Sequence, residues 1–241
     1  IQKFTIDMLS AFINKDGTEL LIPNTKDYQK YKLYPVANSY NNSKRECVYI
    51  AGRSGAGKST WMSRYMLSFL DRFPEASVNI FSRVGDDPAY TKIRDCYPEN
   101  ENPINYVDMV EIMNCPIDSD IIPNSCCIFD DIDTLDGTVK SIVYDIRNDI
   151  LQTGRHNNSF CLSASHVMKG GNDTKVPILE AHKLVVFPSS AKSHVRDFLK
   201  TYGDLDKKEI DKVMKIKGKW ITLRKEGNPY ILHERGAFLL D

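Results

Sequence analysis

Residues 47–60 read Cys47-Val48-Tyr49-Ile50-Ala51-Gly52-Arg53-Ser54-Gly55-Ala56-Gly57-Lys58-Ser59-Thr60. The segment from Gly52 to Ser59 matches the pattern G-x-x-x-x-G-K-[ST] of a phosphate-binding loop. The mostly apolar residues 47–50 before it are typical of a buried parallel strand. The apolar residues after it recur at helical spacing up to residue 70, and Phe73-Pro74 would end that helix. A strand, a glycine-rich loop and a helix in this order predict a nucleotide-binding site.

The loop suggests a role for each part of its backbone and side chains. Glycines let the main chain approach an anion without a Cβ clash, and the amides at the helix start point at the phosphates. Lys58 is expected to reach the β- and γ-phosphates, and the Ser59 hydroxyl to ligate Mg²⁺. We predict nucleotide contacts from nine consecutive residues: Gly52, Arg53, Ser54, Gly55, Ala56, Gly57, Lys58, Ser59 and Thr60.

Composition places the chain among ordinary soluble globular proteins. Its 241 residues are enough for one large domain with a sizeable core. The formal net charge is +0, so any contact with nucleic acid must come from a local patch. No run of residues approaches the ~18 apolar residues of a membrane span, so we expect no membrane segment. The six cysteines show no zinc-type spacing. The four in predicted strands are expected to be buried and reduced.

Strand and helix patterns alternate after the loop. Strands are expected at 77–82, 126–131, 160–166 and 183–188, and a helix over 138–152 with Gly154 as its C-terminal stop. Residues 85–125 are rich in loops, with short elements expected near 88–95 and 106–113. A closing hairpin is expected from residues 220–223 and 230–232. The fold class is therefore α/β, with a mostly parallel sheet and helices on both faces.

We divide the chain into three parts. Residues 1–44 form an N-terminal extension that packs on the core, although the tyrosines between 28 and 49 leave an aromatic nucleic-acid platform as the alternative. Residues 45–191 form the core with the phosphate-binding loop. Residues 192–241 form a basic helical segment and the hairpin, within the same domain. Between 192 and 226 there are eleven Lys/Arg and six acids, which indicates either a solvated helical face or a contact patch for a phosphate backbone.

Two adjacent carboxylates end the predicted strand at 126–131. Asp130 is placed to hold Mg²⁺, directly or through water. Asp131 is placed to orient or deprotonate the attacking water. The structural alternative is that Asp131 and Asp133 cap the helix that follows.

Two further candidates follow in the chain. His166 ends the predicted strand at 160–166, where a polar side chain can sense the γ-phosphate or position water; a structural histidine is the alternative. Arg155 is expected at the opposite edge of the sheet from the chain's own phosphates, so it could act on a neighbouring subunit as an arginine finger. A structural ion pair is the alternative for Arg155, and Arg53 and Arg83 are the other sources of positive charge.

At these residues the chain resembles the genome-packaging ATPases of large DNA viruses, of the FtsK–HerA superfamily. The resemblance covers residues 45 to 241. It departs from the family pattern at Lys219, where an arginine often precedes the tryptophan, and at His166, where glutamine is common. It is carried by five segments: Gly52 to Thr60, Ile128-Phe129-Asp130-Asp131, Gly154-Arg155-His156, Glu180-Ala181-His182-Lys183 with Val185-Val186-Phe187-Pro188, and Lys219-Trp220-Ile221 with Tyr230 and Gly236 to Leu240.

The resemblance implies a RecA-like P-loop NTPase core, in which the sensor strand lies between the loop strand and the acid strand. It implies an ATPase that uses ATP and Mg²⁺. It also implies a homo-oligomeric ring, pentameric or hexameric, that translocates double-stranded DNA into a preformed capsid at a portal vertex. The expected location is the host cytoplasm, at the viral factory, and the virion.

Other functions remain open on the same loop. Another ring P-loop ATPase, such as a helicase, is the first alternative. A small-molecule phosphotransferase would need an arginine-rich lid, and no compact arginine cluster follows the strand at 160–166. A regulatory GTPase would need an N-K-x-D motif downstream of the loop, which the sequence lacks. A scaffold with a vestigial site is disfavoured by the intact Lys58, Ser59 and Asp130.

Overall fold

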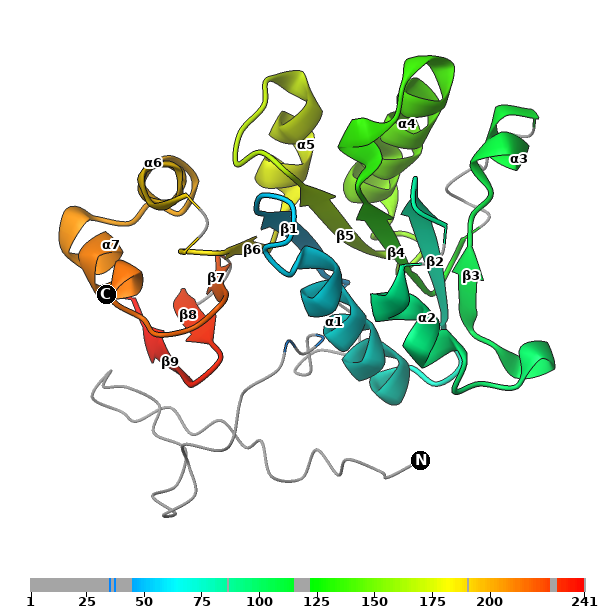
Figure 1. Cartoon of the computed structure of the whole chain (residues 1–241), viewed down its shortest axis with the longest axis horizontal. Coiled ribbons are helices and arrows are strands. Elements are labelled where there is room, and N and C mark those ends of the chain that lie inside the picture. Colours follow the sequence, from blue (N-terminus) through cyan, green and yellow to red (C-terminus); the bar gives the residue numbers. More distant parts are fainter. Residues whose placement is uncertain are drawn as a thin grey trace, which may run out of the picture.

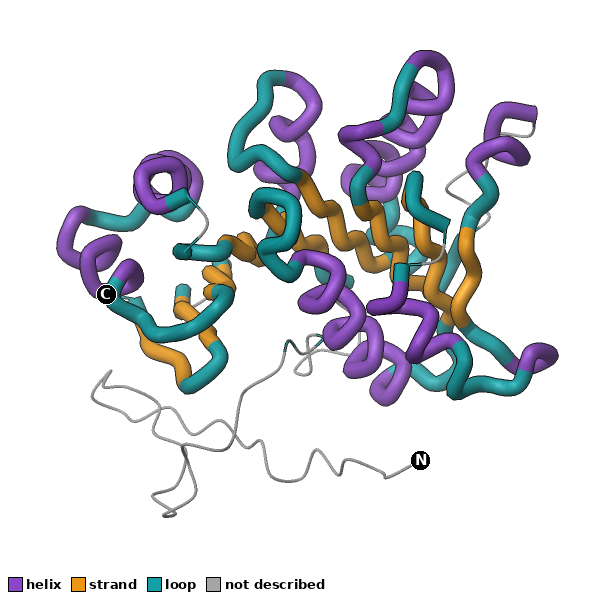
Figure 2. The backbone as a smooth tube through the Cα atoms, viewed as in Figure 1, coloured by secondary structure: helices purple, strands orange, loops and turns teal. Residues whose placement is uncertain are grey.

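A nine-stranded sheet runs through the chain, with helices on both of its faces (Figures 1 and 2). The computed structural model describes residues 45–85, 87–114, 122–189, 191–225 and 229–240, together with Pro35 and Ala37. The strands follow the spatial order β3-β2-β4-β5-β1-β6-β7-β8-β9. Their bounds are β1 Cys47–Ala51, β2 Ser77–Ser82, β3 Ile104–Tyr106, β4 Ser125–Asp130, β5 Phe160–Ser165, β6 Lys183–Val186, β7 Ile221–Arg224, β8 Tyr230–His233 and β9 Gly236–Leu239.

Seven α-helices and two short 3-10 helices connect these strands within the described ranges. Helix α1 and helix α2 lie on one face of the sheet, and α4 and α5 lie on the other (Figure 1). Their bounds are α1 Lys58–Arg72, α2 Pro88–Arg94, η3 Glu99–Glu101, α3 Met109–Asn114, η5 Ile132–Thr134, α4 Gly137–Thr153, α5 Asn172–Glu180, α6 Lys192–Tyr202 and α7 Lys207–Met214.

The six strands from β3 to β6 are all parallel, and β7, β8 and β9 continue the sheet in antiparallel pairs. The predicted α/β class and the predicted hairpin are confirmed; the expected turn at residues 227–229 lies partly outside the described residues. Strand β5 lies between β1 and β4, which is the RecA-like order that the resemblance implied. The prediction missed β3, because three residues give too short a pattern to recognise, and β9, which begins with Gly236, a residue type depleted in strands.

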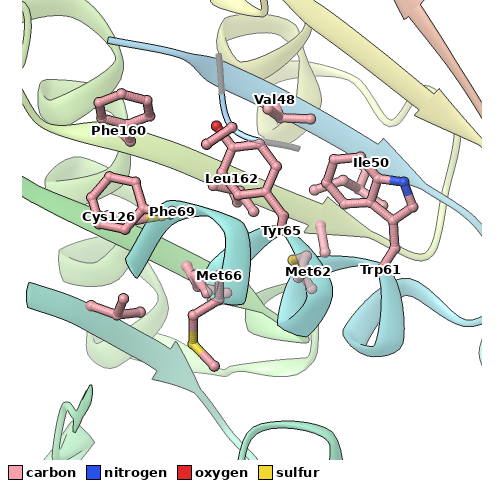
Figure 3. Close-up of a cluster of buried hydrophobic side chains, with 14 of the residues drawn as sticks. Val48, Ile50, Trp61, Met62, Tyr65, Met66, Phe69, Cys126, Phe160 and Leu162 are labelled. Atoms are coloured by element: carbon pink, nitrogen blue, oxygen red, sulfur yellow. The ribbon is translucent and has the colours of Figure 1, made fainter. Parts of the chain in front are cut away.

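Helix α1 covers the face of the sheet formed by β1, β5 and β4 (Figure 3). Its apolar side chains recur every three or four residues, so they form one stripe that the sheet buries. The stripe contacts Val48 and Ile50, which point to the same side because side chains alternate along a strand. The helix ends at Arg72, as the sequence predicted. The amide of the C-cap residue Phe73 donates a hydrogen bond of 2.8 Å to the Phe69 carbonyl.

The opposite face of the same strands packs against α4. Cys47, Cys127 and Cys161 lie on neighbouring strands there and are fully buried. Burial raises the pKa of the Cys127 thiol to about 12, because an apolar core disfavours the thiolate. These cysteines are free thiols, as predicted.

α4 ends at Thr153 with Gly154 as its C-cap, as predicted, but the conformation of this glycine differs from the usual one. A glycine stop usually adopts the left-handed conformation, whereas Gly154 has φ −56°. A Cβ at this position would lie 2.7 Å from Nη1 of Arg45. The Arg45 guanidinium donates to the carbonyls of Ile150 and Leu151, the latter at 2.5 Å. The same Cβ would lie 2.5 Å from the Ile150 carbonyl oxygen, so Gly154 is required by the main chain of the last turn of α4 as well as by the arginine that binds its open carbonyls.

A buried charged pair joins the residue before β1 to the first residue of β6. Lys183 Nζ lies 2.6 Å from Glu46 Oε1, and the Tyr65 hydroxyl of α1 donates to Glu46 Oε2 at 2.5 Å. His182 Nδ1 accepts the Cys47 amide at 2.7 Å beside them. These contacts fix the strand that leads into the phosphate-binding loop against its neighbour in the sheet.

The N-terminal region is described only at two positions before residue 45. The Ala37 amide donates to the Ser68 hydroxyl of α1 at 3.1 Å, and the Ala37 side chain is buried in the core. The remaining predicted extension, including Tyr28, lies outside the described residues, and the boundaries at 45 and 192 stay predictions. In the described part of the chain, the helices are too short or too polar to traverse a lipid bilayer.

Candidate functional site

The phosphate-binding loop leaves the carboxyl end of β1 and enters α1 at Lys58. Gly55 has φ +73° and Gly57 has φ +106°, a region of backbone space that residues with a Cβ rarely occupy. The Gly52 amide donates to the Ser165 carbonyl at 3.1 Å, which ties the loop to the end of β5. Arg53, Ser54 and Gly55 are exposed. The predicted loop therefore has the open, glycine-dependent shape that an approaching phosphate requires.

Phe187 supports this loop from below. It follows β6 directly and is buried. A Cβ added to Gly52 would lie 2.7 Å from a ring carbon of Phe187, and one added to Gly57 would lie 3.6 Å from the ring. The ring thus fills the space that a larger side chain would need at position 52, and the loop has little room to sink toward the core.

Lys58 and the two predicted acids meet at the start of α1. Strand β4 ends at Asp130, and Asp131 follows it. The Lys58 side chain is only 5% exposed, and its Nζ lies 3.9 Å from Asp131 Oδ1. A buried ammonium beside the loop amides is positioned to interact with anionic phosphate oxygens.

Asp130 has the properties of a cation ligand. It is 2% exposed, and its Oδ2 accepts a hydrogen bond of 2.9 Å from the Tyr90 hydroxyl. Its Oδ1 is buried without a hydrogen-bond partner among the described residues. Burial raises the pKa of this carboxyl, although the Ser59 and Tyr90 hydroxyls and Lys58 offset part of that effect. An orphaned carboxylate oxygen next to Ser59 fits the oxygen ligands that Mg²⁺ prefers.

Asp131 occupies an unusual backbone position. Its φ is +54°, in the left-handed region, and its side chain makes no capping hydrogen bond to the 3-10 helix η5. The capping alternative for Asp131 is therefore not what the structure shows. Residues held in sparsely populated backbone regions are concentrated at functional sites. The turn directs the Asp131 carboxylate toward Lys58 and His166 instead.

His166 lies between two carboxylates. Its Nε2 is 3.2 Å from Asp131 Oδ1, and its Nδ1 is 3.0 Å from Asp133 Oδ1. The His166 amide also donates to Asp133 Oδ2 at 2.9 Å. Burial would raise the pKa of Asp133, but the hydrogen bonds and the nearby charge of His166 and Lys58 lower it below its usual range. Asp133 is therefore a carboxylate, not a helix cap, and it holds both the backbone and the ring of His166.

The arginines named from the sequence lie in different places. Arg155 is exposed, between α4 and β5, at the amino edge of the parallel strands. The loop and the acids lie at the carboxyl edge, so the structure does not bring Arg155 to them. Arg83 follows β2 and donates from Nη1 to the Thr134 carbonyl of η5 at 2.6 Å. Arg53 is exposed within the loop itself.

Three residues of the site were not predicted from the sequence. Phe187 and Tyr90 reach the loop and Asp130 through the fold, and no local pattern indicates either contact. Asp133 was considered only as a cap. The sequence signal that could have indicated its role is the pattern of an apolar Ile132 between two acids. In the structure Ile132 is buried in the core, and the carboxylates of Asp131 and Asp133 lie on the open side of η5.

Taken together, the parallel sheet order, the glycine loop and the carboxylates define a P-loop NTPase with a RecA-like core. No family model matches the sequence. The uncharacterized protein V3 of Sputnik virophage is 38% identical to this chain over 234 residues, covering 94% of this chain and 88% of that protein. The chain belongs to the family of this virophage protein.

Solved structures share the fold at low sequence identity. One is the DNA-packaging ATPase B204 from Sulfolobus turreted icosahedral virus, with a TM-score of 0.50 and 15% identity over 76% of this chain and 93% of that chain. Another is the pCW3 conjugation coupling protein TcpA, with a TM-score of 0.52 and 12% identity over 96% of this chain and 72% of that chain. The chain thus shares its fold with a viral DNA-packaging ATPase and with a conjugation coupling protein, and the RecA-like fold that the resemblance implied is confirmed.

The contact between Gly52 and Phe187 gives a test of the loop geometry. We expect Gly52→Ala to weaken ATP binding at least tenfold, because the added methyl group would push the loop away from Phe187. Phe187→Leu removes the obstructing ring edge, so the double variant should regain most of the affinity. Fluorescence titration with a labelled ATP analogue measures both, and Gly85→Ala, where a Cβ would meet open space, is the matched control. Equal affinity of Gly52→Ala and wild type would contradict the supporting role of Phe187.

Proposed function

We propose that this chain is an ATP-hydrolysing subunit of a homo-oligomeric ring motor that translocates double-stranded viral DNA into a preformed capsid. The observation that carries the proposal is the convergence of Lys58, Asp131 and His166 beside the glycine loop. We take the adjacent carboxylates Asp130 and Asp131 to suit activation of water better than binding of an acceptor. The solved packaging ATPase B204, whose fold the chain shares, supports the choice of motor.

Each residue of the site has a separate role in the proposed reaction. Ser59 and Asp130 would hold Mg²⁺, which neutralises charge on the phosphate oxygens when it is bound. Asp131 orients the attacking water and accepts its proton. The bond from the water oxygen to the γ-phosphorus forms while the bond from that phosphorus to the bridging oxygen breaks, and ADP and phosphate leave. Lys58 stabilises charge on the β- and γ-phosphates, and His166 contacts the same Asp131 oxygen that Lys58 approaches.

The DNA-binding surface is proposed on α7. Lys208, Lys212 and Lys215 are exposed and project from the side opposite the buried Ile210 and Val213. The spacing of these lysines places them on one helical face, where they could follow a row of phosphates. We further propose that the ring assembles in the host cytoplasm and docks at a capsid vertex, where the virion is filled.

ATP hydrolysis with and without double-stranded DNA tests this function. We expect DNA to raise the steady-state rate of the wild type at low salt, and the stimulation to fade as salt rises, because counterions compete with lysines for the phosphates. Lys58→Ala serves as the blank without turnover. Replacing Lys208, Lys212 and Lys215 by glutamine should remove most of the stimulation and leave the basal rate unchanged. A rate that is indifferent to DNA and raised by a nucleoside would instead indicate a phosphotransferase.

The position of Arg155 gives a second test, of action between subunits. Arg155→Ala should bind ATP with wild-type affinity, because the residue lies at the opposite edge of its own sheet. Its turnover should fall by roughly 10³-fold or more if it completes a neighbour's site. Mixing Arg155→Ala with Lys58→Ala subunits should restore some activity, since a ring then contains interfaces with one intact Lys58 and one intact Arg155. Arg155→Ala turnover at the wild-type rate would exclude this role and leave Arg53 and Arg83 as candidates.

A further inference from the structure

Two hydrogen-bonded loops meet at His166, and one carboxylate joins them. Asp133 belongs to η5, which follows β4, whereas His166 follows β5. Asp133 Oδ2 accepts the His166 amide at 2.9 Å and lies 3.4 Å from the Ser165 hydroxyl. Both of its oxygens approach the ring nitrogen Nδ1, at 3.0 and 3.1 Å. One side chain therefore fixes the main chain and the imidazole of the neighbouring strand end.

The position of Asp133 is itself well fixed. Ile132 is buried in the core below it, and the Thr134 hydroxyl donates to the Asp131 carbonyl at 2.6 Å. The Arg83 guanidinium holds the Thr134 carbonyl from β2. η5 is thus tied to β4, to β2 and, through Asp133, to β5. A side chain on such a segment can impose an orientation on its partner.

The two carboxylates determine how the His166 ring is oriented. An ionised carboxylate has no proton to donate, so the proton in the contact with Asp133 must belong to Nδ1. The groups that face His166 are Asp133 at Nδ1 and Asp131 at Nε2, and Lys58 approaches the same Asp131 oxygen. With Nδ1 held by Asp133, the ring cannot rotate without losing that bond, and Nε2 stays directed at Asp131.

We propose that Asp133 is a positioning residue for ATP hydrolysis, which acts by holding the His166 ring through Nδ1–H so that Nε2 is directed at Asp131. The inference rests on the proposed function and adds a residue to it. Asp133 does not reach Lys58 and makes no contact with the glycine loop among the described residues; it acts through His166. The arrangement follows the logic of the aspartate that orients the histidine of serine hydrolases, where loss of the carboxylate allows the wrong tautomer.

The same three side chains could be read as a cation site, since one donor atom from each of Asp131, Asp133 and His166 lies within 4.8 Å of the others. The distances favour hydrogen bonding instead. Nδ1 and the Asp133 oxygens are as close to one another as a direct hydrogen bond requires. A cation ligated by both groups would have to displace this bond and the proton on Nδ1.

Kinetics in two backgrounds test the proposal. Asp133→Asn should lower kcat for ATP hydrolysis roughly ten- to a hundredfold, as is usual for carboxylates that orient a functional histidine, with KM within about twofold of wild type. In a His166→Ala background the same change should have no further effect, because the residue it positions is absent. Asp136→Asn is the matched control, since Asp136 is exposed and its side chain caps nothing. Equal losses in both backgrounds, or a raised KM with unchanged kcat, would overturn the proposal.

A second measurement does not depend on turnover. Nitrogen NMR of ¹⁵N-labelled histidine in the wild type should show a proton on Nδ1 of His166, with signals assigned by their loss in His166→Ala. An Nδ1 without a proton in the wild type would overturn the proposal, even if Asp133→Asn failed to fold. Absence of ATPase activity with an Nδ1–H ring would contradict the proposed function and leave the positioning of His166 by Asp133 intact.

Discussion

The parallel register of β1, β5 and β4 is the constraint on which the site depends. Ala51 pairs with Ser165, and Phe129 pairs with Ser163, so the three strands end at one edge of the sheet. The glycine loop, His166 and the two acids leave the sheet from these ends. Their side chains are within hydrogen-bonding reach because adjacent strands are about 4.8 Å apart. An insertion that moved β5 out of this position would separate the sensor from the acids without altering any of the residues.

The site concentrates groups that a folded protein usually avoids burying. Asp130 keeps an oxygen without a partner, Lys58 is almost fully buried, and Asp131 adopts a left-handed backbone. Each feature costs stability, and each disposes its group toward a phosphate or a cation. The surrounding core compensates: α1 packs a continuous apolar stripe on the sheet, and Phe187 fills the space beneath Gly52. The loop can be open to solvent because the layer beneath it is rigid.

Most strands of the sheet, but only some residues of the site, could be predicted from the sequence. The parallel strands were predictable because each is an apolar run of four to six residues, and the loop because its glycine spacing is specific. β3 was not, because three residues give no recognisable run, and β9 was not, because it begins with a glycine, which is depleted in strands. The helix stop at Gly154 was predicted, but its crowding against Arg45 was not, because Arg45 lies more than a hundred residues earlier in the chain.

The residues of the site likewise fall into those that a local pattern predicts and those that it does not. Lys58, Asp130, Asp131 and His166 stand at strand and helix ends, where local patterns locate them. Tyr90 and Phe187 reach the site only through tertiary packing, which a pattern of local spacing does not contain.

The central claim is that Asp131 activates water for ATP hydrolysis beside an intact phosphate-binding loop. The most direct test measures ATP affinity and single-turnover hydrolysis of Asp131→Asn on the same preparation. The account predicts an affinity within about threefold of wild type and a hydrolysis rate reduced by at least 10²-fold, as for the loss of a general base. Hydrolysis at the wild-type rate would contradict the account, and would place the catalytic base elsewhere on this edge of the sheet.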